Sequence, residues 1–165
     1  MKKGTVKRRL IMSELWKPDK CRYYEKVNSF HKTTLGKPAQ WLIDAAASIG
    51  LDLSGFRHEI ITGDFKRHVI KRHGNIALHG KATIMDADFM RLPDIIKAPS
   101  IAIIGAIRKS RRYIVYAKAE PGMTYIYFEQ IFGSHRNRVL RGSTFYKVTR
   151  SLRPAAANPA PLLDS

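Results

Sequence analysis

The stretch IAIIGAIRKSRRYIVYAKAEPGMTYIYFEQIF, residues 101–132, decides the fold class of this 165-residue chain. It holds three runs rich in β-branched and aromatic residues, a composition typical of strands. RKSRR and EPG separate the runs, and such short polar segments favour hairpin turns. We therefore expect three antiparallel strands. VLRGSTFYKVT, residues 139–149, supplies one or two more extended segments.

Helical patterns precede these strands. Apolar residues recur at helical spacing between Pro38 and Gly50, which predicts a helix at roughly 38–49. HEIIT, residues 58–62, is a short extended segment, after which Thr62 can cap a second helix that ends near Arg72, with Gly74 as its stop.

Two short helices or turns are expected next, with Asp86 as an N-cap and with Pro93 and Pro99 as breaks. Helices followed by a run of strands is the α+β order. The predicted fold has N-terminal helices packed on an antiparallel β-sheet meander of four or more strands.

The length fits one domain with two tails. Residues 1–32 are rich in Lys and Arg without a sustained period, so we interpret them as a basic N-terminal arm. Residues 33–150 form the expected domain. Residues 151–165 have the proline and alanine content of a linker-like C-terminal tail.

Composition narrows the function classes. Thirty Lys and Arg against 13 Asp and Glu give a net charge of +17, which indicates a polyanionic partner, RNA or DNA. The single cysteine, Cys21, excludes an internal disulfide and a thiolate zinc cluster. No apolar run approaches the ~20 residues that span a bilayer, so we expect no membrane insertion. Glycine-rich nucleotide motifs are absent from the sequence, and we expect neither a cofactor nor a metal.

The segment FKRHVIKRHG, residues 65–74, carries two histidines on the second predicted helix. At about 100° per residue, His73 projects from the apolar arc and His68 lies at the edge of the charged face. His73 could be an ordinary core histidine. Metal-free RNA cleavage, however, needs a base for the ribose 2′-hydroxyl and an acid for the leaving 5′-oxygen, and histidine suits both roles.

These strings together resemble a known superfamily. FKRHVIKRHG, the proline-broken LPDIIKAPS, the basic hairpin and the terminal GSTFYKV are similar to the barnase/EndoU/colicin/RelE-like ribonucleases, in the branch of phage proteins and polymorphic bacterial toxins. The resemblance covers roughly residues 56–150. Ala98-Pro99 stands where Asn-Pro is usual, which leaves the neighbouring loop geometry open.

The resemblance implies a four-stranded antiparallel sheet and a metal-independent endoribonuclease. Such enzymes cleave RNA, often tRNA, by 2′-hydroxyl attack that leaves a 2′,3′-cyclic phosphate. The residues that match the catalytic positions are His68, His73, Ser143, Thr144 and Tyr146. Basic side chains expected to bind the nucleic acid are Lys66, Arg67, Lys71, Arg72, Arg108, Lys109, Arg111, Arg112, His135, Arg136, Arg138, Arg141 and Lys147.

Two other functions remain open on the sequence. A non-catalytic RNA- or DNA-binding module needs only the charge and the aromatic strands. An ADP-ribosyl transfer toxin could use Glu129 and the strand tyrosines, although no arginine or serine motif supports it. For the ribonuclease, the expected partners are RNA, including tRNA, and an acidic inhibitor or immunity protein. The expected location is the bacterial cytoplasm, with delivery into another cell as an option.

Overall fold

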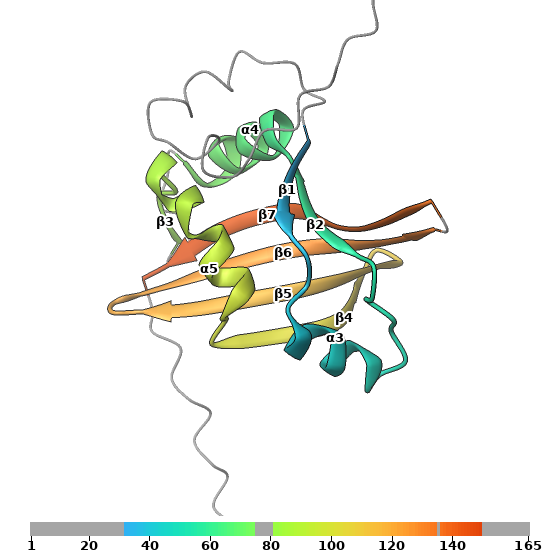
Figure 1. Ribbon diagram of the computed structural model, residues 1–165. Coiled ribbons are helices and arrows are strands. Elements are labelled where there is room, and N and C mark those ends of the chain that lie inside the picture. Colours follow the sequence, from blue (N-terminus) through green and yellow to red (C-terminus); the bar gives the residue numbers. More distant parts are fainter. Residues whose placement is uncertain (1–31, 75–80, 135, 150–165) are drawn as a thin grey trace, which may run out of the picture.

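The computed structural model describes residues 32–74, 81–134 and 136–149 (Figure 1). Apart from Lys32, the predicted N-terminal arm and C-terminal tail lie outside the described residues. The chain builds a mixed α+β structure around one seven-stranded sheet with the main order β1-β2-β7-β6-β5-β4.

The second half of the chain forms the predicted meander. Strands β4 (Ile101–Arg108), β5 (Arg111–Glu120), β6 (Met123–Ser134) and β7 (Asn137–Val148) are antiparallel neighbours. Lys109 and Ser110, with φ of 49° and 61°, turn β4 into β5. Positive φ at both central residues matches the right-handed twist of the flanking strands, so a two-residue loop suffices.

The prediction of a purely antiparallel sheet was wrong. Strand β2 (Arg57–Ile61) pairs with β7 in parallel, and β1 (Lys32–Gly36) adds antiparallel to β2. The short β3 (Lys81–Ala82) pairs with the far end of β7. The helices therefore alternate with strands instead of preceding them. Pairing between segments some 80 residues apart depends on tertiary packing, which a local pattern does not encode.

Within the described residues, three helices and one 3₁₀ turn accompany the sheet: α3 (Gln40–Ala47), α4 (Thr62–His73), η1 (Asp86–Arg91) and α5 (Leu92–Lys97). Ile61 and Met85 occupy the N-cap positions predicted for Thr62 and Asp86. The Asp88 carboxylate accepts a hydrogen bond from the Met85 N–H at 2.7 Å, which satisfies one donor at the start of η1. No described helix is long and apolar enough to cross a membrane.

The core lies between these helices and one face of the sheet. Leu42 of α3, Phe65 of α4, Phe89 of η1 and Ile95 of α5 are buried in one cluster with Phe145 of β7. Figure 1 shows α5 crossing in front of the sheet, with α4 beyond the β7 edge. We call the helix-covered side the core face and the opposite side the outer face.

Along the edge opposite β6, strand β7 pairs with other strands in two separate places. β2 pairs with residues 139–141 and β3 with residues 147–148, so the stretch between them borders α4. A Cβ at Gly142 would lie 2.6 Å from Tyr127 Oη and 2.7 Å from Ile60 Cγ2, so only glycine fits there. A bulge follows, because Glu129 pairs with Gly142 while Phe128 pairs with Thr144, leaving Ser143 as the extra residue.

A buried polar network links β2 to β5 and β6. The Glu129 carboxylate accepts hydrogen bonds from Tyr116 Oη at 2.9 Å and Tyr127 Oη at 3.1 Å, and it lies 2.8 Å from His58 Nδ1. All four side chains are at most 1% exposed. Burial, followed by the Glu129 charge, raises the pKa of both tyrosines, so each keeps the proton that it donates.

We expect Glu129→Ala to lower the free energy of unfolding by about 3–5 kcal/mol, because it leaves three buried polar groups, those of His58, Tyr116 and Tyr127, without their shared partner. Tyr116→Phe should cost only about 1–2 kcal/mol, because Glu129 keeps its other two partners. Urea unfolding followed by circular dichroism measures both. Equal losses in the two variants would contradict a central role for the carboxylate.

Candidate active site

His73 contacts the last strand on the outer face. Its ring centroid lies 5.4 Å from that of Tyr146, and its Nε2 lies 3.5 Å from Thr144 Oγ1. The alternation along β7 explains this arrangement: Phe145 and Lys147 are buried on the core face, so Thr144 and Tyr146 point to the outer face. His73, at the end of α4, reaches them past the edge of β7. All three side chains are half-buried.

Tyr146 lies between two other rings. Its second neighbour is Phe128 of β6, with centroids 6.2 Å apart and an interplanar angle of 27°. Burial raises the pKa of the Tyr146 phenol, and the positive charge of Arg108 partly offsets that rise. Tyr146 is therefore protonated at neutral pH. The positive charge that acts on its phenol comes from Arg108 of the β4–β5 hairpin.

The two histidines are not brought together. Five residues along α4 correspond to a rotation of about 140°, and His68 is exposed on the helix surface beside Arg72. Burial, and to a lesser extent the Arg72 charge, lowers the pKa of His68. Ser143, the third polar residue of the predicted strand group, occupies the bulge and is half-buried. Of the predicted catalytic positions, the structure brings together His73, Thr144 and Tyr146.

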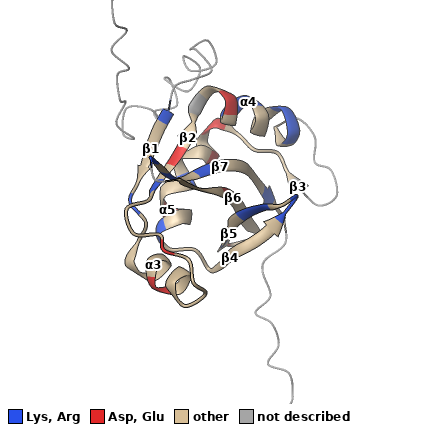
Figure 2. Cartoon of the chain, turned by 90° about the vertical axis from the view of Figure 1, so that its right-hand side faces the viewer, with Lys and Arg blue, Asp and Glu red and all other residues tan. Residues whose placement is uncertain are grey.

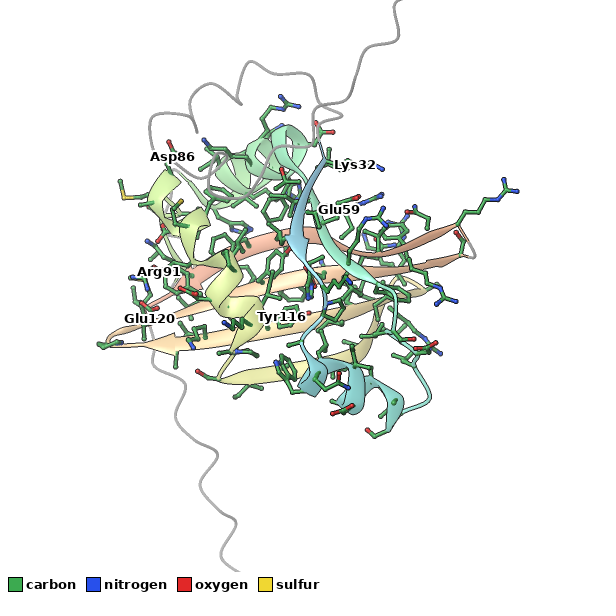
Figure 3. The ribbon with its side chains drawn as sticks, viewed as in Figure 1. Lys32, Glu59, Asp86, Arg91, Tyr116 and Glu120 are labelled. Carbon is green, nitrogen blue, oxygen red and sulfur yellow. The ribbon has the colours of Figure 1, made fainter. Side chains whose placement is uncertain are left out.

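Two of the predicted nucleic-acid ligands, Lys66 and Lys147, are buried and pair with carboxylates of η1. Lys66 is 4% exposed and its Nζ lies 2.9 Å from Asp86 Oδ1, while Lys147 Nζ lies 2.8 Å from Asp88 Oδ2 on the core face. Figure 3 labels Asp86 beside the end of α4. Both lysines connect η1 to the rest of the domain, which gives them a structural role that their charge did not indicate.

Other predicted ligands remain on the surface. Lys71, Arg72, Arg108, Lys109, Arg111, Arg112 and Arg136 are exposed. Arg67 pairs with Asp64 at 2.5 Å, and Arg138 donates to the Ser54 carbonyl at 3.3 Å. His135 lies outside the described residues. Figure 2 shows Lys and Arg on the C-terminal half of α4 and at the start of β1.

Arg141 belongs to a group that the sequence did not reveal. Arg141, Lys32 and Arg57 all pair with the Glu59 carboxylate, and we call these three cations and Glu59 the Glu59 cluster. Arg57 and Glu59 alternate with buried residues in β2, a period of two that could have indicated a charged outer face. Their meeting with Arg141 depends on the parallel β2–β7 pairing.

A family model described as phage-Barnase-EndoU-ColicinE5/D-RelE like nuclease3 matches residues 36–153. The chain belongs to this nuclease family. The match confirms the resemblance inferred from residues 56–150 and extends it toward both ends. No curated protein and no solved structure is similar enough to this nuclease-family chain to count as a match.

The described residues contain no group of three or more His, Cys, Asp or Glu side chains arranged to hold a metal ion. The polar groups that meet where α4 reaches β7 are the imidazole of His73, the hydroxyl of Thr144 and the phenol of Tyr146. These groups offer proton donors and acceptors, and the charge of Arg108 acts on the Tyr146 phenol. Such a combination can perform acid/base chemistry on an anion.

We expect the Tyr146 phenol to titrate above its ordinary pKa near 10. Arg108→Gln should raise that pKa further, because it removes a positive charge that favours the phenolate. Carbon NMR of Cζ-labelled tyrosine, assigned with Tyr146→Phe, measures the titration, and Arg111→Gln serves as the control. A Tyr146 pKa at or below 10 would show that the ring is not shielded as described.

Proposed function

We propose that this nuclease-family chain is a metal-independent endoribonuclease whose proton-transfer group is His73. The observation that carries the proposal is the contact of the His73 ring with Thr144 and Tyr146 on the outer face. A histidine enclosed in the core would not meet a substrate, whereas this one is half-buried beside two polar residues of another element.

The chemistry follows from the three groups. Imidazole is the side chain best suited to proton transfer near neutral pH, so His73 can deprotonate the ribose 2′-hydroxyl. Attack of that oxygen on the adjacent phosphorus breaks the bond to the 5′-oxygen and leaves a 2′,3′-cyclic phosphate. The Tyr146 phenol is protonated at neutral pH, since burial raises its pKa above an ordinary value that is already near 10, and its O–H can donate a hydrogen bond to the phosphate or a proton to the leaving oxygen. Thr144 orients the imidazole.

Positive charge near His73, Thr144 and Tyr146 would stabilise the negative charge that builds up on the phosphate in the transition state. Arg108 acts on Tyr146 through its charge, and Arg111 pairs with Arg108 across the hairpin. Guanidinium groups bind phosphate oxygens in a bidentate manner and stay charged at any physiological pH. The β4–β5 hairpin therefore supplies the electrostatic part of the proposed mechanism.

The two-histidine mechanism expected from the sequence requires His68 at the same phosphate, and its position on α4 does not favour this. The ADP-ribosyl transfer alternative needs Glu129 at a substrate, but Glu129 is 0% exposed. We further propose RNA as the substrate, with tRNA the first to test, in a bacterial cytoplasm. An acidic inhibitor protein would fit the same basic surface.

His73→Ala should lower the rate of RNA cleavage by about 10²–10⁴-fold, the usual loss when a positioned acid or base is removed. His68→Ala, on the same helix but exposed, is the matched control and should retain activity within a few-fold. Total tRNA is incubated with purified protein in EDTA, and the fragments are tested for a cyclic phosphate. Thermal unfolding verifies that both variants fold.

Equal losses in both variants would restore the two-histidine mechanism. Full activity in His73→Ala, or activity that EDTA abolishes, would reject the proposal. A gel shift without cleavage by the wild-type protein would support the non-catalytic binding module instead.

Arg111→Ala combined with Arg112→Ala should weaken RNA binding and make the plot of log affinity against log salt shallower by about one to two units, because fewer counterions are released. Base preference should not change, since phosphate contacts carry no sequence information. Fluorescence anisotropy with a labelled oligonucleotide provides both values. An unaltered slope would place the RNA away from the hairpin.

A further inference from the structure

The Glu59 cluster lies on the same face of the sheet as His73, Thr144 and Tyr146. In β2, Arg57 and Glu59 alternate with His58 and Ile60, which are buried in the core. Arg141 of β7 is in register with Glu59. Figure 3 shows Lys32 and Glu59 close together on β1 and β2.

Charge in the cluster is unbalanced. The Glu59 carboxylate lies 3.2 Å from Arg141 Nη2, 3.5 Å from Arg57 Nη2 and 3.8 Å from Lys32 Nζ. One carboxylate thus serves three cations, and Glu59 itself is only 2% exposed. The cluster keeps a surplus of two positive charges.

Donors are in surplus as well. The Nε atoms of Arg57 and Arg141 are buried, and neither has a hydrogen-bond acceptor among the described residues. A buried donor without an acceptor costs free energy that a bound anion can recover once the side chains adjust to it. The Arg141 guanidinium also lies over the Phe132 ring, 4.7 Å from its centroid, which orients its plane.

Position links the cluster to the proposed active site. Arg141 precedes Thr144 by three residues in β7, but the bulge at Ser143 leaves their β6 partners, Gln130 and Phe128, only two residues apart. Arg141 and Thr144 therefore point to the same face, about 7 Å apart at the ordinary strand rise. A nucleic-acid strand whose scissile phosphate lies at His73 would pass over Arg141 when it follows β7 toward β2.

We propose that the Glu59 cluster is a phosphate-binding subsite for a nucleotide beside the one that is cleaved. This inference rests on the proposed function. Its ligand is the phosphodiester backbone of single-stranded RNA, because the half-buried Phe128, Phe132 and Tyr146 on the same face offer rings for unpaired bases. Glu59 holds the cations in place and limits their net charge when no RNA is bound.

The test uses the full chain and a fluorescein-labelled 2′-O-methyl RNA oligonucleotide, which binds but lacks the attacking hydroxyl. The variant combines Arg57→Gln, Glu59→Gln and Arg141→Gln, so no buried carboxylate is left without its cations. We expect about tenfold weaker binding and a salt slope shallower by about one unit.

The matched control combines Arg91→Gln, Lys97→Gln and Glu120→Gln. It changes the net charge by the same amount and removes the Arg91–Glu120 ion pair of 2.7 Å, which lies away from the cluster (Figure 3). Its affinity should stay near that of the wild type. If the cluster variant folds, as judged by circular dichroism, and binds like this control, the subsite is rejected.

Glu59→Gln alone separates a ligand site from a structural ion pair. Removing the competing carboxylate should tighten RNA binding several-fold, whereas a purely structural role predicts a lower melting temperature without tighter binding. Full cleavage by His73→Ala together with weak binding by the cluster variant would reject the proposed function and retain the subsite. The reverse pattern would reject the subsite alone.

Discussion

Strand β7 supports both the core and the candidate active site, because adjacent side chains on a strand point to opposite faces. Phe145 and Lys147 fill the core face, the latter paired with Asp88. Thr144 and Tyr146 then lie on the outer face, where His73 meets them. A slip of one residue in register would exchange the two sets, so core packing and site geometry constrain each other.

The second constraint is the point where α4 borders β7. Between the stretches that pair with β2 and β3, β7 has a glycine followed by a bulge. The absence of a side chain at Gly142 makes room for Ile60 and Tyr127. α4 buries Phe65 and Val69 against the core face. Its C-terminal residue, His73, therefore lies at the border of the sheet and can contact the other side.

The basic side chains behind the high net charge fall into two groups, one paired inside the domain and one on its surface. Lys66 and Lys147 neutralise carboxylates of η1 inside the domain and contribute to folding. The arginines of the β4–β5 hairpin and of the Glu59 cluster are arranged with fewer acids than cations, which suits a phosphate backbone. The His58–Glu129 network lies on the core face, and its side chains are at most 1% exposed, too little to contact a substrate. The proposed function therefore uses the outer face.

Local patterns predicted the meander from β4 to β7 and the second helix, because turn residues, β-branched runs and helical spacing act within short segments. The family was indicated by the resemblance of several sequence motifs, and the family-model match confirms it. That resemblance also placed Thr144, Tyr146 and His73 among the site candidates. Tertiary structure decided which histidine reaches β7, because exposure of a helix face depends on what packs against it. It likewise decided the parallel β2–β7 pairing and the burial of Lys66 and Lys147, since ion pairs between distant segments form only when the chain has closed around its core.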